Sequence, residues 1–341
     1  MDKPEKFSWR IPWKGIALTF MVSMLALLVV VWRMANPASV LEGLGEYPLI
    51  YFFGALFFVL AAWLVDGQRI GMLARAVGHS VPWWQLAITL GAANFLTLVT
   101  PFAGGGGALI IYFLYRRGLK GSTATAIVLA GGLAGQLSLA SLGLVVFSNL
   151  INIPPDLARY FDAVRIGAVL YIAVLITLLV LIVRSKRFFQ WIVRKKGESR
   201  PVVWFEEFRS TIHFILGQRR GHFLACYAVA FSYYVVYYAG SFMLLTGFGV
   251  YSPWLRYAIA VLFGVAPIFS PIPGGAGVSE GIAWVVLDSV LTPDLLGTFI
   301  VLWRAVVFYI PILLGGTIFA SMAMKWANKV ILPEEADHTK E

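Results

Sequence analysis

The chain has 341 residues, of which 60% are hydrophobic and only 13% are charged, and its formal net charge is +10. Soluble domains are about half apolar and about a quarter charged, so this composition excludes a water-soluble globule, a disordered chain and a fibrous repeat. The single cysteine, Cys226, excludes a disulfide framework within the chain and a thiolate metal cluster. The composition therefore predicts an all-α polytopic membrane protein, with 12 Trp and 25 Phe available for contact with lipid.

Eight apolar stretches approach or exceed the length that a membrane-spanning helix needs, which is about 20 residues. In chain order they are 15–32, 48–65, 83–100, 123–147, 166–183, 222–246, 254–270 and 298–324. The first is read as an anchor, because a signal peptide would have a shorter apolar region and a small-residue cleavage site. Two shorter stretches, 108–115 and 281–287, follow Pro- and Gly-rich breaks and are too short to cross alone. We therefore expect about eight spanning helices plus two re-entrant hairpins, 83–115 and 254–291.

The distribution of positive charge indicates the orientation, since short cytoplasmic loops carry an excess of Lys and Arg. If each broken segment returns to its side of entry, 22 of the 27 basic residues lie on one side. They fall in 1–14, 67–82, 116–121, 184–221 and 325–341. We expect both termini on the cytoplasmic side, a single transmembrane domain over 1–324, and a solvated acidic tail over 325–341.

The two breaks resemble each other in sequence. Residues 100–107 (TPFAGGGG) align with 270–277 (SPIPGGAG) at an offset of 170 positions. The identities are Pro101 with Pro271, Gly104 with Gly274, Gly105 with Gly275, and Gly107 with Gly277. The first hairpin is expected to enter from the cytoplasm and the second from outside. Two such loops in corresponding halves indicate an inverted-repeat transporter.

Breaks of this kind predict a binding site. Proline removes a backbone donor, glycine permits left-handed backbone, and unpaired backbone groups at membrane depth persist only in a protein interior or a wet cavity. Helix N-termini near Ala108 and Val278 would offer N–H groups to an anion such as a phosphate headgroup. Substrate contacts are therefore predicted at both members of the four identical pairs and at Pro273. The alternative is a pair of kinked structural helices without a ligand.

Ionisable and polar residues inside predicted spans are further candidates. Glu280 lies just past the second break, and Arg304 lies about two turns into the last span, with Tyr309 following. A Glu280–Arg304 pair could hold a phosphate through the arginine, or could be a structural ion pair that locks the second hairpin to the last helix. Asn94 and Gln136 are candidates for substrate binding or for hydrogen bonds between helices.

The segment 184–221 carries ten basic residues, and Phe205, Phe208, Ile212 and Ile215 recur in it at helical spacing. This pattern predicts an amphipathic helix on the inner leaflet, with anionic lipids as its partner in preference to nucleic acid.

No catalytic signature is present in the sequence. The four histidines have no metal-ligand spacing, and the glycine run at 104–107 lacks the Lys-Ser/Thr of a phosphate-binding loop. We expect no metal or other cofactor, no ATP-driven pump, and a transporter in place of an enzyme.

The run PIPGGAGVSE at 271–280, followed by Arg304 and by Tyr309-Ile310-Pro311, resembles the lysylphosphatidylglycerol synthase transmembrane region. This region is the flippase half of the bacterial multiple peptide resistance factor. The resemblance extends from the first span to about Met324. Stand-alone members occur in bacteria and archaea, which implies a prokaryotic cytoplasmic membrane.

The chain departs from the family pattern in its first half. An acidic residue and an arginine follow the first break in the family, where this chain has Gly106, Gly107 and Ala108. The acidic-Arg pattern of the next span is replaced by Gly131, Gly132 and Gly135, whereas Arg116 and Arg117 match the basic turn. The aminoacyl-transfer domain has no counterpart, so the resemblance does not imply lysyl transfer.

The predicted function is that of a flippase-like lipid translocase with a central polar cavity. Its substrate would be an anionic phospholipid, an aminoacyl-phospholipid or a polyprenyl-linked headgroup, moved by rocking of one repeat against the other. The alternatives are a membrane enzyme acting on lipid-linked glycans and a membrane scaffold for a glycosyltransferase. Assembly as a homo-oligomer is left open.

Overall fold

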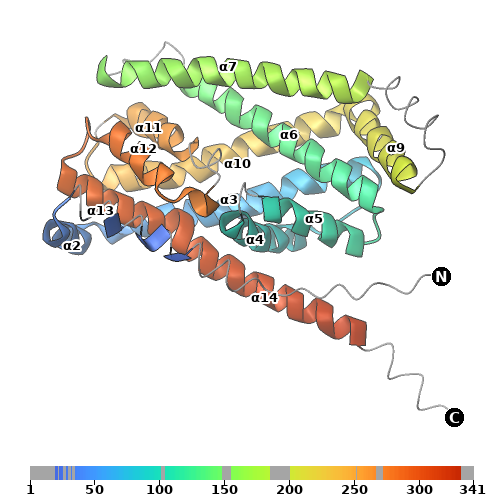
Figure 1. Ribbon diagram of the computed structural model, residues 1–341, viewed down its shortest axis with the longest axis horizontal. Coiled ribbons are helices and arrows are strands. Elements are labelled where there is room, and N and C mark those ends of the chain that lie inside the picture. Colours follow the sequence, from blue (N-terminus) through green and yellow to red (C-terminus); the bar gives the residue numbers. More distant parts are fainter. Residues whose placement is uncertain are drawn as a thin grey trace.

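A computed structural model describes most of the chain, and all of the regular secondary structure in the described part is helical (Figure 1). The described residues are 20–21, 23–25, 28–29, 32, 35–100, 104–147, 155–184, 200–250, 252–265 and 272–331. Four predicted features lie wholly or largely outside them: most of the first span, Pro101, Pro271, and residues 332–341 of the acidic tail.

The helices follow one another in the order that Figure 1 labels. They are α2 (Pro37–Glu46), α3 (Leu49–Ala76), α4 (Trp83–Val99), α5 (Gly104–Arg116), α6 (Gly121–Val146), α7 (Pro155–Arg184), α9 (Arg200–His213), η2 (Phe214–Gln218), α10 (Arg220–Gly247), α11 (Pro253–Val265), η4 (Pro273–Gly275), α12 (Val278–Leu287), α13 (Pro293–Arg304), η5 (Ala305–Tyr309) and α14 (Ile310–Ile331). Of these, η2 and η5 are π-helical turns and η4 is a 3₁₀ turn.

Proline marks where several helices begin. Pro37, Pro155, Pro253 and Pro293 are the first residues of α2, α7, α11 and α13. Proline suits this position because its fixed φ is helical and its missing N–H would have had no partner in the helix. At α2 the preceding Asn36 completes the start, since its side-chain oxygen accepts from the N–H of Ala38 at 3.0 Å.

Four helical segments are long and apolar enough to cross a membrane: α3, α6, α10 and the continuous helix from Pro293 to Trp326. The protein is therefore a multi-pass helical membrane protein. Within the described residues α4 has 17 residues and α11 has 13, and each folds back against the helix that follows it. The total of about eight spans stays a prediction.

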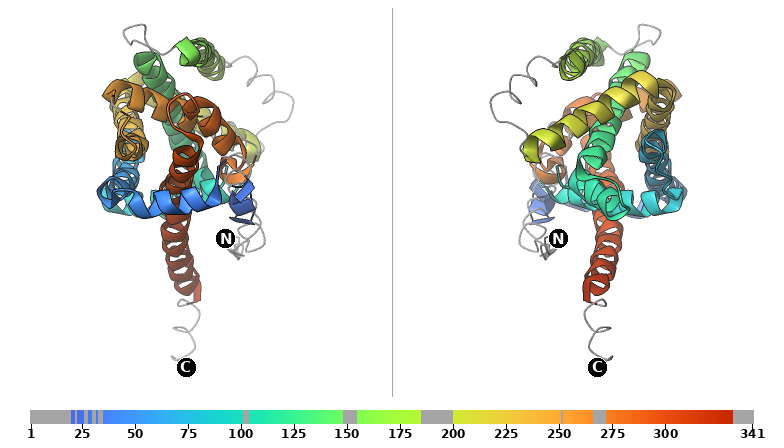
Figure 2. Two further views of the ribbon diagram at one scale, coloured as in Figure 1. Left: turned by 90° about the vertical axis from the view of Figure 1, so that its left-hand side faces the viewer. Right: turned by 90° about the vertical axis from the view of Figure 1, so that its right-hand side faces the viewer.

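The two helix pairs α4–α5 and α11–α12 lie toward opposite ends of the molecule (Figure 1). Figure 2 views the same helices along the long axis, with α7 on the outside of α6. The tip of the second pair, η4, contacts α4 of the first pair. The two broken segments therefore meet inside the bundle, and re-entry into a membrane remains the sequence-based prediction for both.

Each helix pair has its own hydrophobic core. In one core, Ala283 and Trp284 of α12 pack with Tyr238 of α10 and Phe299 of α13. In the other, Leu109 and Phe113 of α5 pack with side chains of α3, α4, α6 and α14. Tyr309 of η5 packs against both cores. The π-helical turn thus lies where the two halves join.

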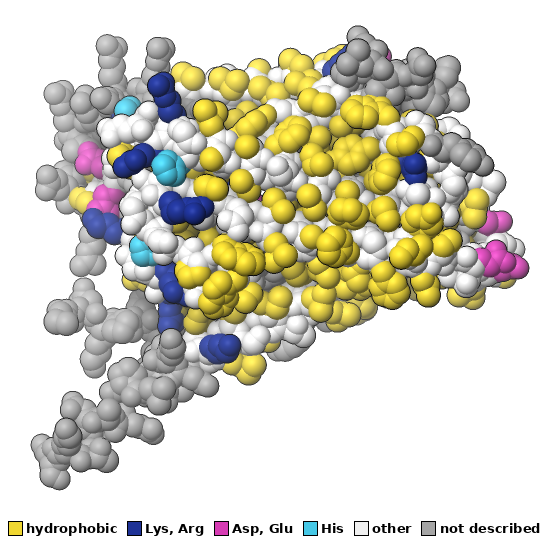
Figure 3. All heavy atoms as spheres, turned by 180° about the vertical axis from the view of Figure 1, so that it is seen from behind, with side chains coloured by type: hydrophobic (Ala, Val, Ile, Leu, Met, Phe, Trp, Pro, Cys, Tyr) yellow, Lys and Arg dark blue, Asp and Glu magenta, His cyan; other side chains and the backbone are white. Residues whose placement is uncertain are grey.

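The surface shows how the molecule is suited to a membrane. A broad band of hydrophobic side chains covers one face, and most of the visible Lys, Arg and His side chains gather at one end of it (Figure 3). Exposed basic residues from the turns and helix ends include Arg75, Arg116, Arg117, Lys120, Arg219 and Arg220. This segregation agrees with the charge asymmetry of the sequence.

Two helix boundaries and the packing of one helix differ from the sequence-based expectations. Helix α3 continues to Ala76, so much of 67–82 is helix and not loop. Helix α14 continues to Ile331, beyond the predicted end of the domain at residue 324. Helix α9 packs against α6, and Phe208, Ile212 and Ile215 are buried in the protein. The apolar face that was expected to lie in the leaflet is thus covered by protein, while Phe205 is 36% exposed.

Candidate functional site

A cavity of about 300 Å³ lies at the meeting point of the two broken segments. Its walls come from α4, α6, α10, α11, the second break and the α13–η5 junction. The lining residues are Asn94, Thr97, Leu98, Thr100, Gln136, Tyr233, Tyr234, Tyr237, Tyr238, Ser241, Gly264, Ile272, Gly274, Gly275, Trp303, Arg304, Val307 and Phe308. Five of the predicted site residues are among them: Asn94, Gln136, Gly274, Gly275 and Arg304.

Arg304 and Glu280 form a buried ion pair beside this cavity. The Nε of Arg304 donates to Oε1 of Glu280 at 2.6 Å, and Nη2 donates to Oε2 at 2.6 Å. The side chains are 2% and 0% exposed. This bidentate geometry is the strong form of a charge-assisted contact. Glu280 does not line the cavity itself but contacts Arg304, which does.

The second break folds around the same arginine. Nη1 of Arg304 donates to the carbonyl oxygen of Gly274 at 2.8 Å, and Nη2 donates to that of Gly275 at 3.3 Å. Both glycines have left-handed backbone, with φ of +63° and +67°, as expected for this break. The ring of Phe308 lies against Gly274, where an added Cβ would overlap it. The turn is thus fixed to the last helix by charge and by packing.

The N-terminus of α12 is already capped by the protein. Oε2 of Glu280 accepts from the N–H of Gly277 at 2.8 Å, and Gly277 has φ of +80°. The carboxylate therefore occupies the place where an anion was expected near Val278. At this break the backbone presents carbonyl oxygens to Arg304, and the helix end carries its own negative charge.

The first break is built differently from the second. Helix α5 begins at Gly104 and not near Ala108, so the glycine run is helical. The N–H of Gly105 donates to Oγ1 of Thr100 at 3.0 Å, which caps this end. A Cβ at Gly106 would lie 2.7 Å from the carbonyl oxygen of Ala93. Glycine here permits close approach of α5 to α4, and the described residues 104–108 of this break do not form the expected open anion site.

Asn94 and Gln136 line the cavity, and the described part of the chain provides neither with a hydrogen-bond partner. Within the described residues neither side chain forms a hydrogen bond, and Oε1 of Gln136 is buried. Buried polar side chains normally have a partner. Among the described helices neither residue forms the hydrogen bond between helices that was the alternative, and both remain candidates for ligand binding.

Four tyrosines of α10 complete the wall and were not singled out in the sequence. Tyr233, Tyr234, Tyr237 and Tyr238 all line the cavity. The rings of Tyr233 and Tyr237 stack at 5.9 Å, and those of Tyr234 and Tyr238 stack at 6.2 Å. The signal was the repeat of a Tyr-Tyr pair after four positions, which returns to the same helix face.

A second internal ion pair was also missed. Arg69 of α3 pairs with Asp66 through two hydrogen bonds, and its Nη1 donates to the carbonyl oxygen of Gly131 at 2.6 Å. The side chains of Arg69 and Asp66 are 16% and 14% exposed. In the sequence, Asp66 directly follows the predicted span 48–65, and Arg69 falls in the predicted cytoplasmic part 67–82. The i, i+3 spacing of opposite charges was the available signal.

The other predicted site residues that the structure describes are not among the residues that line the cavity. The hydroxyl of Tyr309 lies 3.3 Å from that of Ser23. Gly104, Gly105, Gly107 and Gly277 do not line the cavity, and Pro273 contributes backbone to η4.

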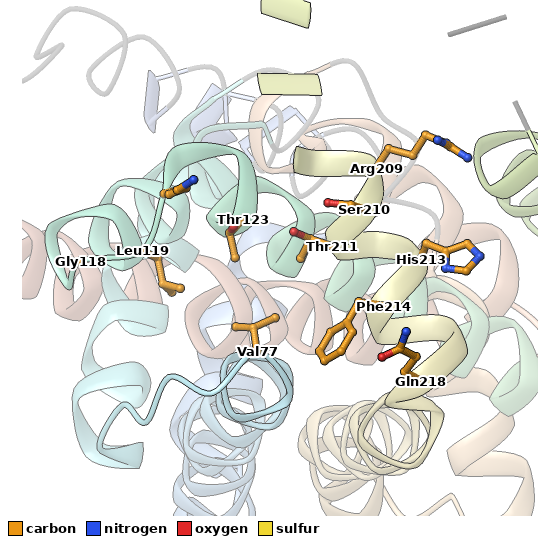
Figure 4. Close-up of a pocket in the computed structure, with 11 residues that line it drawn as sticks. Val77, Gly118, Leu119, Thr123, Arg209, Ser210, Thr211, His213, Phe214 and Gln218 are labelled. Carbon is orange, nitrogen blue, oxygen red and sulfur yellow. The ribbon is translucent and has the colours of Figure 1, made fainter. Parts of the chain in front are cut away.

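A wider pocket of about 760 Å³ opens at the basic end, between the α5–α6 turn and α9. Figure 4 shows Thr123, Thr211 and Phe214 facing this space, while Arg209 and His213 point away from it. It contains no predicted site residue. No cluster of His, Cys, Asp or Glu suited to a metal occurs in the part of the chain that the structure describes.

One carboxylate near this pocket has a shifted pKa. Glu207 of α9 accepts from Nζ of Lys120 at 2.5 Å and from Oγ of Ser122 at 2.7 Å. These hydrogen bonds, first from Lys120 and then from Ser122, hold the pKa of Glu207 below its ordinary value because they favour the charged form. The contact ties α9 to the start of α6.

The comparisons with known proteins agree with the sequence motif. No curated protein matches the chain. The family model described as "Lysylphosphatidylglycerol synthase TM region" matches residues 15–315, which include both helix pairs, the ion pair and the cavity. The chain therefore belongs to the lysylphosphatidylglycerol synthase transmembrane-region family.

Proposed function

We propose that this protein is a lipid translocase that moves a lipid headgroup through the central cavity, and that it acts as a transporter and not as an enzyme. The observation that carries the proposal is the cavity between the two helix pairs, whose wall is rich in hydrogen-bonding side chains although the chain as a whole is strongly apolar. Polar groups at membrane depth are costly and usually mark a substrate pathway.

In this proposal the two helix pairs are re-entrant hairpins of an inverted repeat. They enter from opposite membrane faces, and the end that is rich in Lys and Arg faces the cytoplasm. Rocking of one half against the other would open the cavity alternately to each face. The Arg304–Glu280 pair would keep the second break attached to the last helix during this motion.

The test is a liposome assay with a variant that fills the cavity. The purified protein is reconstituted with fluorescent phospholipids, and dithionite bleaching reports exposure of inner-leaflet lipid. Gln136→Trp places a large side chain in the cavity. Gly132→Trp is the matched control, because Gly132 is on the same helix and has open space around it.

We expect the wild type and Gly132→Trp to expose inner-leaflet lipid at similar rates, and Gln136→Trp to be at least tenfold slower. Equal rates for all three proteins would mean that lipid does not pass through this cavity. Bleaching no faster than in protein-free liposomes, for every lipid tried, would contradict translocation without an added driving force.

A further inference from the structure

The chemistry of the cavity wall narrows the class of headgroup that it can bind. Nine of its lining side chains carry a hydroxyl or an amide: Asn94, Thr97, Thr100, Gln136, Tyr233, Tyr234, Tyr237, Tyr238 and Ser241. Thr97 and Thr100 donate to carbonyl oxygens of their own helix. Within the described residues, the other seven side chains form no hydrogen bond. They form an unsaturated set of donors and acceptors directed at one space.

The cavity offers no net charge to a ligand. Arg304 is the one charged side chain in the described lining, and both oxygens of Glu280 already neutralise it. A phosphate that took over the guanidinium would leave the Glu280 carboxylate buried without its partner, which is strongly unfavourable. A phosphate in the cavity would therefore find no unpaired cation to bind in the described lining.

An ammonium headgroup would lack a counterion for the same reason. Asp66, the other internal carboxylate described above, is paired with Arg69 through both of its oxygens. No carboxylate lines the cavity in the described part of the chain. Stacking of an ammonium on the tyrosine rings would have to occur close to the Arg304 guanidinium.

A sugar or another polyol matches the wall in both its polar and its apolar parts. Hydroxyl and amide side chains can each donate and accept, as the hydroxyls of a polyol require. The stacked rings of the four tyrosines, with interplanar angles of 26° and 18° within the two pairs, give an apolar surface for the C–H face of a sugar ring. The volume of about 300 Å³ is at the small end of ligand pockets, which suits one ring and not an oligosaccharide.

We infer that the headgroup bound in this cavity is a neutral polyhydroxylated group, a single sugar or polyol, carried on a lipid. The inference rests on the proposed translocase. Of the headgroups expected from the sequence, it fits a lipid-linked headgroup whose sugar, and not its phosphate or an ammonium group, contacts the cavity.

Binding to the purified full chain tests the inference separately from transport. The protein is kept in lauryldimethylamine oxide, since glycoside detergents would compete for the site. Three probes are titrated by calorimetry: dihexanoyl monoglucosyl glycerol, dihexanoyl phosphatidylglycerol and methyl β-glucoside. The last probe shows whether a free sugar binds as well as a glycolipid. The fluorescent forms of the two lipids are followed in parallel by the dithionite assay.

The test variant is Tyr234→Phe/Tyr237→Phe, which removes two hydroxyls and keeps the rings that pack in the wall. The control is Tyr115→Phe, because Tyr115 is 59% exposed on α5 and is outside the cavity. We expect the glucosyl lipid to bind at least tenfold more tightly than phosphatidylglycerol. We expect the double variant to weaken that binding about tenfold, and the control to leave it unchanged.

Tighter binding of phosphatidylglycerol, or binding of neither lipid, would overturn the inference about the headgroup. If phosphatidylglycerol crossed the membrane in that case, the translocase proposal would stand although the inference about the headgroup had failed. Binding of the glucosyl lipid with no lipid crossing would support the headgroup class and contradict translocation. Equal binding of methyl glucoside and the glucosyl lipid would keep the sugar chemistry and overturn the lipid as its carrier.

Discussion

The guanidinium of Arg69 lies over the backbone of Gly131. Its Nη1 donates to the carbonyl oxygen of Gly131 at 2.6 Å, and it would lie 3.5 Å from a Cβ added at that residue. The Cδ1 of Ile70 would be 3.1 Å from the same Cβ. The small residue on α6 thus lies in close contact with Ile70 and Arg69 of α3, and a side chain longer than a methyl group there would have to displace them.

We predict that Gly131→Leu destabilises the protein and that Gly132→Leu does not. Overpacking a filled site costs about 1–3 kcal/mol, and replacing a helical glycine gains at most about 1 kcal/mol. A Cβ at Gly132, one position further on, would lie in open space, so Gly132→Leu improves helix propensity without overpacking. Thermal unfolding in detergent measures the difference. Equal melting temperatures for the two variants would contradict the packing of Arg69 against Gly131.

The Glu280–Arg304 pair should show strong coupling in a double-mutant cycle. Removal of one partner leaves a buried charge unpaired and costs about 3–5 kcal/mol. Arg304→Met should therefore lower the melting temperature more than Glu280→Gln/Arg304→Met does, since the double variant buries no charge. Effects that simply add in the double variant would show that the two residues do not act as a pair.

The glycines of the first break should differ in their tolerance of bulk. A Cβ added at Gly106 would lie 2.7 Å from the carbonyl oxygen of Ala93, whereas a Cβ added at Gly104 would meet no described heavy atom within 4 Å. We expect Gly106→Leu to lower the yield of folded protein and Gly104→Leu to retain it. Size-exclusion profiles of the two variants provide the measurement, and a folded Gly106→Leu protein would exclude the close approach of α5 to α4.

Acid should loosen the attachment of α9 through Glu207. The folded-state pKa of Glu207 is depressed, so its contribution to stability is present above the unfolded pKa of about 4.3 and is lost as pH falls through the lower folded pKa. The melting temperature of the wild type should therefore drop below about pH 4.3 more steeply than that of Glu207→Gln. Glu206→Gln serves as the neighbouring control. Parallel curves for the wild type and Glu207→Gln would contradict the contact with Lys120 and Ser122.

The second half of the site was predictable because the same residues encode its backbone and its charges. A Pro-Gly-Gly turn followed by Glu280 places a carboxylate at the third residue of the next helix, and Arg304 is the available cation in the last span. Chain order and charge balance sufficed to pair them. The structure confirms the all-helical class and the left-handed glycines of the second break, and the match to the family model confirms the family.

The first half was less predictable, because one residue type has two uses. Gly274 is a left-handed turn residue, whereas its aligned partner Gly104 begins a helix. The alignment of letters did not distinguish a conformational role from a packing role. The apolar side chains of α9 were ambiguous for a similar reason, since a hydrophobic stripe has the same period whether lipid or another helix covers it. Cavity-facing tyrosines likewise could not be separated from lipid-facing aromatics by composition.

The contact between Gly274 and Phe308 has a consequence for sequence variation in the family. The turn residue Gly274 and the ring of Phe308 share one space, so a larger residue at position 274 requires a smaller one at position 308. Relatives with a β-carbon in place of Gly274 should carry a smaller residue in place of Phe308, and the two columns of an alignment should covary. This dependence follows from the space that the Gly274 turn and the Phe308 ring share.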